Sequence, residues 1–181
     1  MRLKKTKWTL ALIISSLIFT GLMLWVKIPT GIAHTQINLG MGWLAVVTAA
    51  GGPILGMLVA LFGHAVHDLY FIGNAWWSWV IADGLFGLLL GLATQRLKLG
   101  QGQLTWAKIW QFNLWQLVDN VIAWMVIAPL GDVLIYGSSS AIVFKQGWYA
   151  GLSNFLVIAT VGTCGLWLYQ KIYQWRQVKD V

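Results

Sequence analysis

Long apolar runs, nearly free of charged residues, follow one another along most of the chain. Runs that begin near Trp8, Pro53, Trp76, Ile109 and Gln146 are each close to the roughly 20 residues that an α-helix needs to cross a bilayer. Only 9% of the 181 residues are charged, whereas soluble proteins carry about 25%. The alternation of apolar and polar residues that marks a membrane β-barrel is missing. The sequence therefore predicts an all-α integral membrane protein.

We expect a single transmembrane domain over residues 1–181, in which six helices form a bundle. Pro29 ends the first helix, because proline cannot continue helical hydrogen bonding, and the short second span is expected to be tilted or partly re-entrant. The N-terminus resembles a signal peptide but has no small-residue cleavage site, so we expect a retained helix. In the fourth span, Gly84, Gly87 and Gly91 form a face suited to close helix packing. The predicted spans cover residues 8–26, 37–50, 53–72, 76–94, 109–129 and 146–169, with polar loops at 30–36 and 131–145.

The basic residues predict the orientation of the bundle. Of twelve lysines and arginines, ten lie in the N-terminal segment, the connection between the fourth and fifth spans, or the C-terminal segment; the exceptions are Lys27 and Lys145. Cytoplasmic segments of membrane proteins carry an excess of Lys and Arg, so we expect both termini in the cytoplasm. This topology accounts for the net charge of +7. Since no basic face with interleaved aromatic residues lies outside the membrane, we expect no nucleic-acid binding.

Polar groups gather in and around the stretch 63–87, inside an otherwise apolar sequence. It holds two of the three histidines and two of the five acidic residues. Ionisable groups in a membrane are costly unless they face a cavity or a partner. With the orientation above, most polar groups of the spans fall in the outer half of the bundle, which predicts a pocket open to the outside. The residues we expect to form it are His34, Gln36, Asn38, His67, Asp68, Trp79, Asp83, Asp119, Asn120, Trp124 and Asn154.

An aromatic solute fits these residue types. Trp79 shares a helix face with Asp83, and Trp124 shares one with Asp119 and Asn120. Indole rings can stack on a flat ligand, while the polar side chains can bind ring nitrogens and hydroxyls. Tryptophan is also enriched where helices meet the membrane surface, and we assign Trp76, Trp77 and Trp148 to that role.

The same residues could also form three other kinds of site. A metal ion could bind His34, His64, His67 and Asp68, although no cysteine or further histidine completes a closed shell. A haem or quinone site would favour histidines on facing helices, and an aspartate pair for intramembrane proteolysis lacks its flanking motifs. No GxxxxGK[ST] segment is present, so ATP hydrolysis is not expected. We expect neither a cofactor nor an enzyme activity.

Three segments resemble the substrate-binding S components of energy-coupling factor (ECF) vitamin transporters. They are IPTGIAHTQINLG (28–40), GGPILGMLVALFGHAVHDL (51–69) and WWSWVIADGLFGLLLGL (76–92). The chain is most similar to the riboflavin-type and hydroxymethylpyrimidine-type branch. The resemblance covers nearly the whole chain, and these segments are its specific part.

The resemblance implies a bacterial cell-membrane protein that captures a vitamin at its outer face. It also implies association with a transmembrane coupling subunit and two cytoplasmic ATPases that supply the energy. The family's first-helix AxxxA motif, which contacts the coupling subunit, matches Ala11 and Ser15, with serine in place of the second alanine; ordinary helix packing within the bundle is the alternative. We expect the loop 30–36 to close over a ligand held by Asp83, Asp119 and Trp79. Hydroxymethylpyrimidine, pyridoxine and riboflavin-like molecules remain open as substrates, and a metal ion is the alternative cargo.

Overall fold

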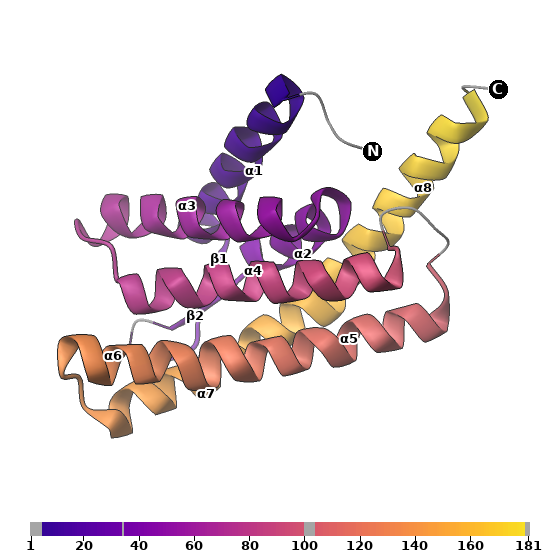
Figure 1. Ribbon diagram of the computed structural model, residues 1–181. Coiled ribbons are helices and arrows are strands. Elements are labelled where there is room, and N and C mark those ends of the chain that lie inside the picture. The colour runs from indigo at the N-terminus through magenta and orange to yellow at the C-terminus, as the bar shows by residue number, and fades with distance from the viewer. Residues whose placement is uncertain (1–4, 34, 100–103, 180–181) are drawn as a thin grey trace.

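A computed structural model describes residues 5–33, 35–99 and 104–179, and it forms a bundle of helices (Figure 1). The first four helices are α1 (Lys5–Trp25), α2 (Gly40–Gly51), α3 (Pro53–Phe71) and α4 (Trp77–Leu97). A long fifth helix comprises α5 (Trp106–Asn120), the π-helical segment η1 (Val121–Ile127) and α6 (Ala128–Tyr136). A sixth comprises α7 (Ser140–Val157), the π-helical segment η2 (Ile158–Gly162) and α8 (Thr163–Lys179).

Five of these helices are long and apolar enough to cross a membrane. The exception is α2, whose 12 residues extend only about 18 Å at about 1.5 Å per residue. That is well short of the roughly 30 Å hydrocarbon core. The second predicted span therefore forms a short helix that does not cross a bilayer by its own length.

A small β-hairpin joins α1 to α2. Strand β1 (Lys27–Pro29) pairs antiparallel with β2 (Gln36–Asn38), and Ile28 lies opposite Ile37. The α1 helix ends at Trp25, one residue before the predicted end, and Pro29 is the last residue of β1. Of the predicted loop at 30–36, residues 30–33 and 35 lie between the two strands, and the final residue, Gln36, belongs to β2.

The prediction of a loop at 131–145 is wrong, because both flanking helices continue into this range. The α6 segment runs on to Tyr136 and α7 begins at Ser140, so only three residues join them; Gly137 has a φ of +64° at the turn. Pro129 does not stop the helix. It lies in the first turn of α6, directly after η1, and the first turn of a helix tolerates a missing N–H.

Helices α3 and α4 pack closely through glycine, as predicted. A Cβ atom on Gly87 would lie 2.6 Å from the carbonyl oxygen of Gly56, and one on Gly91 would lie 2.3 Å from Cα of Pro53. Neither approach leaves room for a side chain. In Figure 1, α3, α4 and the α5–α6 helix lie side by side, and the contacts among them agree.

The bundle has two chemically different ends. The hairpin, the α3–α4 connection and the α6–α7 turn lie at one end. In Figure 1 the start of α5 and the ends of α4 and α8 lie toward the other end, while α1 begins at the top of the view; these segments carry Lys5, Lys7, Arg96, Lys108 and Lys171. The predicted basic segments at the end of α4, the start of α5 and the end of α8 thus lie toward the same end of the bundle. That this end faces the cytoplasm remains a prediction.

Candidate functional site

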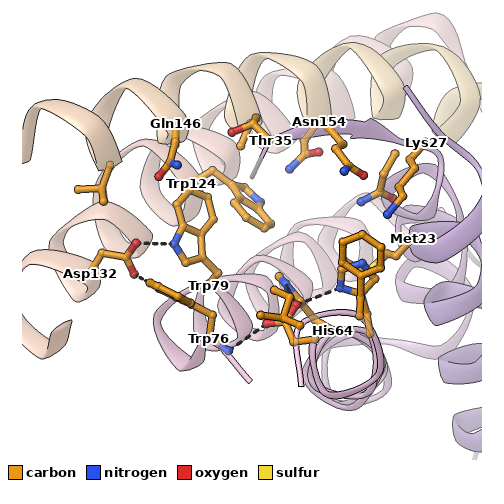
Figure 2. Close-up of a pocket in the computed structure, with 18 of the residues that line it drawn as sticks. Met23, Lys27, Thr35, His64, Trp76, Trp79, Trp124, Asp132, Gln146 and Asn154 are labelled. Atoms are coloured by element: carbon orange, nitrogen blue, oxygen red, sulfur yellow. Dashed lines mark hydrogen bonds and ion pairs between the residues drawn. The ribbon is translucent and has the colours of Figure 1, made fainter. Parts of the chain in front are cut away.

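A cavity of about 540 Å³ lies at the hairpin end of the bundle (Figure 2). Small-molecule pockets commonly enclose about 300–1,000 Å³, so this one can hold a vitamin-sized ligand. Its walls come from the hairpin and from the adjoining parts of the helices. The lining residues are Met23, Lys27, Thr35, Gln36, Asn38, His64, His67, Asp68, Phe71, Ile72, Trp76, Trp79, Trp124, Asp132, Ser138, Ser139, Ile142, Val143, Gln146, Ala150 and Asn154.

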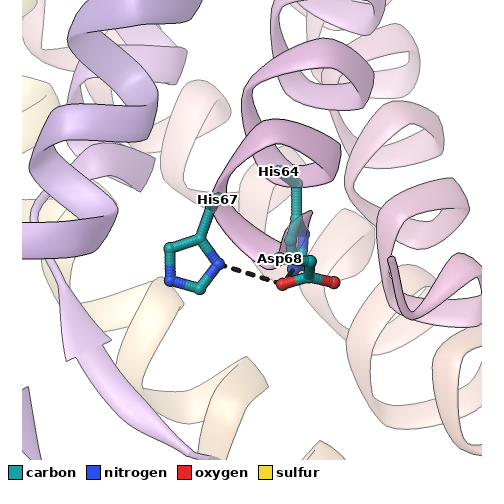
Figure 3. A group of neighbouring side chains, drawn as sticks. All are labelled: His64, His67 and Asp68. Atoms are coloured by element: carbon teal, nitrogen blue, oxygen red, sulfur yellow. Dashed lines mark hydrogen bonds and ion pairs between the residues drawn. The ribbon is translucent and has the colours of Figure 1, made fainter. Parts of the chain in front are cut away.

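One wall is built on His64, which lies between two carboxylates. Its Nδ1 is 2.8 Å from Oδ2 of Asp83 on α4, and its Nε2 is 3.4 Å from Oδ1 of Asp68 on α3. Nδ1 of His67 lies 2.9 Å from the same Asp68 oxygen (Figure 3). The other Asp68 oxygen accepts a hydrogen bond from the backbone N–H of Trp76 at 3.0 Å. This network connects α3, α4 and the segment between them.

Asp132 on α6 holds a second wall together. Its carboxylate accepts hydrogen bonds from the indole N–H of Trp76 at 2.7 Å, from that of Trp79 at 2.8 Å, and from the hydroxyl of Ser78. The Asp132 side chain is buried. Because a buried carboxylate needs donors, the three bonds both satisfy Asp132 and fix the orientation of two indoles.

Aromatic rings cover much of the space between these two walls. The ring centroids of Trp79 and Trp124 are 5.3 Å apart at an interplanar angle of 45°, and Trp124 stacks on His64 at 6.3 Å and 22°. This arrangement of rings suits a ligand that has a flat, apolar face and polar edges. The N–H of Trp124 is buried and has no acceptor among the described residues.

The hairpin forms the remaining side. Lys27 places Nζ 3.8 Å from the centroid of the Phe71 ring, and this nitrogen has no hydrogen-bond partner in the described part of the chain. Partial burial lowers the pKa of the Lys27 ammonium. Near the hairpin tip, the side-chain amide of Gln146 on α7 donates to the carbonyl oxygen of Ala33 at 3.0 Å. The hairpin is thereby tied to the far side of the cavity.

The structure brings seven of the eleven predicted site residues to the cavity. They are Gln36, Asn38, His67, Asp68, Trp79, Trp124 and Asn154. His34 lies outside the described residues. Asp83 does not line the cavity: it is fully buried and contacts His64 instead.

Asp119 and Asn120 do not line the cavity either, although spacing placed them on one helix face with Trp124. Both are buried, and the Asn120 amide donates to the backbone and side-chain oxygens of Gln116 at 2.7 and 3.0 Å. Both residues precede Trp124, the lining residue of this helix that lies farthest from the hairpin end, so they lie about one helical turn deeper in the bundle. A ligand in this cavity is therefore not held directly by Asp83 or Asp119.

Comparison with known protein families gives a match over nearly the whole chain. A family model described as "ECF-type riboflavin transporter, S component" matches residues 3–171. The chain belongs to this family. The resemblance seen in the three sequence segments is thereby confirmed.

Several curated relatives of this S component carry the name "UPF0397 protein". The one from Leuconostoc citreum is 46% identical over 158 residues, which are 87% of this chain and 84% of the relative. Its counterpart from Lactiplantibacillus plantarum is 42% identical over 150 residues, 83% of this chain and 81% of the relative. That from Exiguobacterium sp. is 42% identical over 166 residues, 92% of this chain and 91% of the relative. No solved structure matches the chain.

Sequence reasoning missed several polar or aromatic residues that line the cavity of this S component, among them Lys27, Trp76, Asp132 and Gln146. Asp132 and Gln146 fell in or beside the wrongly predicted loop, and Trp76 was assigned to the membrane surface although its indole N–H bonds Asp132. Two features of the sequence could have pointed to Asp132 and Lys27 as site residues. Asp132 is one of only five acidic residues, and Lys27 is one of two basic residues outside the predicted cytoplasmic segments.

The predicted contact residues for a coupling subunit lie on a covered face of α1. Ser15 is buried, and its carbonyl oxygen accepts a hydrogen bond from the indole N–H of Trp43 on α2 at 3.2 Å. Ala11 is half-buried and packs against the core. The exposed side of this helix instead presents large apolar residues, including Leu10, Ile14 and Leu17. This geometry favours packing within the bundle for Ala11 and Ser15 as the S component stands alone.

Proposed function

We propose that this protein captures a small aromatic, water-soluble vitamin or vitamin precursor from outside a bacterial cell. The candidates are hydroxymethylpyrimidine, pyridoxine and riboflavin-like molecules. The protein then delivers the ligand by associating with a transmembrane coupling subunit and two cytoplasmic ATPases. Membership of the S component family supports the transport role.

The observation that carries the proposal is the pair of indoles, Trp79 and Trp124, at the wall of the cavity. A flat heteroaromatic ring can stack there, and the amides of Gln36 and Asn154 lie in the same cavity to bind its polar edge. The carboxylates of Asp68 and Asp132 already accept several protein hydrogen bonds each. Their arrangement suits a rigid binding site more than proton transfer.

Calorimetric titration of the purified protein in detergent tests this proposal. Riboflavin, pyridoxine and hydroxymethylpyrimidine are titrated one by one, and we expect one of them to bind with 1:1 stoichiometry. Trp79→Ala should weaken that binding about 10-fold, because aromatic contacts and their buried area are lost. Trp148→Ala is the matched control, since Trp148 is 62% exposed and lies outside the cavity. Folded protein that binds none of the three would refute the proposal.

The transport partners need a separate experiment. A tagged copy expressed with the coupling subunit and ATPases of its bacterium should co-purify with all three. Vitamin uptake by such cells should require ATP. Isolation of the S component alone, under conditions where a known S component retains its partners, would count against delivery by this route.

A metal ion is the second candidate cargo, favoured by one observation. The ligand atoms of His64, His67 and Asp68 lie within 4.8 Å of one another at the cavity. Asp83 holds one ring nitrogen of His64 while the other faces Asp68; carboxylates commonly orient metal-binding imidazoles in this way. Elemental analysis of wild-type protein and of a His64→Ala, His67→Ala double variant decides between the cargoes. Equal metal content in both would exclude this site.

A further inference from the structure

The charged side chains that line the cavity differ in how far their hydrogen-bonding capacity is used. Asp68 accepts from His67 and from the backbone of Trp76, with His64 at 3.4 Å. Asp132 accepts from two indoles and one hydroxyl. Both carboxylates are therefore occupied by the protein's own donors.

Lys27 is in the opposite situation. Among the described residues it is the only lysine or arginine that lines the cavity, and its ammonium has no hydrogen-bond acceptor there. It rests instead on the ring of Phe71. The lysine stem is flexible, so an acceptor that enters the cavity can draw the ammonium away from the ring.

The place of Lys27 in the chain adds an independent argument. It is one of two basic residues outside the predicted cytoplasmic segments, and the other, Lys145, is exposed and lies outside the cavity. A basic residue on the outer side opposes the usual charge bias of membrane proteins. A binding role explains why a lysine stands at this position.

Two further groups facing this space have spare capacity. The side chain of Asn154 is buried, lines the cavity and forms no hydrogen bond to another described residue. The N–H of Trp124, which is 5% exposed, also has no acceptor in the described chain. In Figure 2, Trp124, Asn154 and Lys27 surround the same open space. Two of these three groups are donors only.

We propose that the cavity selects a neutral or anionic heteroaromatic ligand through its hydrogen-bond acceptors, with a carbonyl or anionic group of the ligand paired to Lys27. Trp124 and Asn154 bind a second acceptor edge. A cationic ring is disfavoured, because it would meet an unpaired ammonium while both carboxylates are already occupied. This inference rests on the proposed vitamin-binding function and narrows its substrate class.

Calorimetry with the full-length protein tests the inference. The probes are riboflavin, pyridoxine, hydroxymethylpyrimidine and thiamine; thiamine joins a similar aminopyrimidine to a cationic ring. We expect a neutral probe to bind at least about 10-fold more tightly than thiamine. Lys27→Met should lower the affinity for that neutral probe about 10-fold or more, as expected for loss of a charged hydrogen bond. Lys27→Arg should keep most of the affinity. Lys27→Gln replaces the methionine variant if the latter does not fold.

A second test variant and two matched controls separate binding from general damage. Trp124→Phe is the test variant: it keeps an aromatic ring but removes the N–H, and it should lower affinity about 3–10-fold. Lys145→Met and Trp148→Phe, outside the cavity, should leave affinity unchanged. If a neutral vitamin binds equally well to wild type, Lys27→Met and Trp124→Phe, the vitamin function stands and the inference is overturned; tighter binding of thiamine also overturns it. If folded wild-type protein binds no probe, the proposed function fails and the inference fails with it.

Discussion

Asp132 offers the sharpest test of how the cavity is held together, through the substitution Asp132→Asn. The carboxylate has two acceptor oxygens for the indoles of Trp76 and Trp79 and the hydroxyl of Ser78. Asparagine keeps one oxygen and presents an NH₂ group where the other stood, so one indole N–H faces a donor. An unsatisfied buried donor costs about 1–3 kcal/mol, and the remaining bonds lose their charge assistance. We therefore expect a loss of roughly 2–4 kcal/mol in the free energy of unfolding.

Thermal unfolding in detergent, followed by tryptophan emission, measures this loss. For a chain of this length, about 1 kcal/mol shifts the melting temperature by roughly 2–4 °C, so Asp132→Asn should melt roughly 5–15 °C below wild type. Tyr136→Phe, on the same helix, is the control. It removes the hydroxyl that accepts from the backbone N–H of Trp77 at 3.0 Å in an exposed position, where water replaces it. A melting temperature for Asp132→Asn equal to that of wild type would show that the indoles do not depend on this carboxylate.

Three further predictions concern packing, orientation and the hairpin. Gly87→Ala should lower the free energy of unfolding by about 1–3 kcal/mol, because its Cβ would meet the Gly56 carbonyl; unchanged melting would contradict the close α3–α4 contact. In a Cys164→Ser background, Lys145→Cys should react with a membrane-impermeant maleimide in intact cells and Lys98→Cys only after permeabilisation; the opposite pattern would reverse the bundle. Gln146→Ala removes the bond to Ala33 and should speed ligand dissociation about 2–10-fold in stopped-flow experiments; an unchanged rate would mean that this bond does not retain the ligand.

The parts of the fold that depend on hydrophobic length and small-residue spacing could be predicted from the sequence. The apolar runs place the long helices, and Gly87 and Gly91 mark the face where α3 meets α4. Helix ends were less predictable. Glycine and serine near residues 137–140 suggested a long loop, but only the turn at Gly137 interrupts the helices.

The candidate site was predictable where side chains follow regular helical spacing. His67, Asp68 and Trp79 line the cavity because α3 and α4 are regular in this region. Asp119 and Asn120 do not, because the cavity reaches along the fifth helix only as far as Trp124, and spacing along one helix does not show how deep a cavity extends. The partnership of Asp132 with Trp79 joins residues 53 positions apart, and spacing within one helix contains no information about such a contact.

The two carboxylates of the cavity share one structural element, and this bears on how a ligand would bind. Asp68 holds the backbone of Trp76, while Asp132 holds its indole and that of Trp79. The protein's own hydrogen bonds thus fix the start of α4 from both α3 and α6. A ligand that stacks on Trp79 does not have to order that ring first, so less conformational entropy is lost on binding. The hairpin side differs, because among the described residues only one exposed hydrogen bond, from Gln146 to the carbonyl oxygen of Ala33, joins the hairpin to α7. Opening of the cavity should therefore involve the hairpin and leave the tryptophan wall in place.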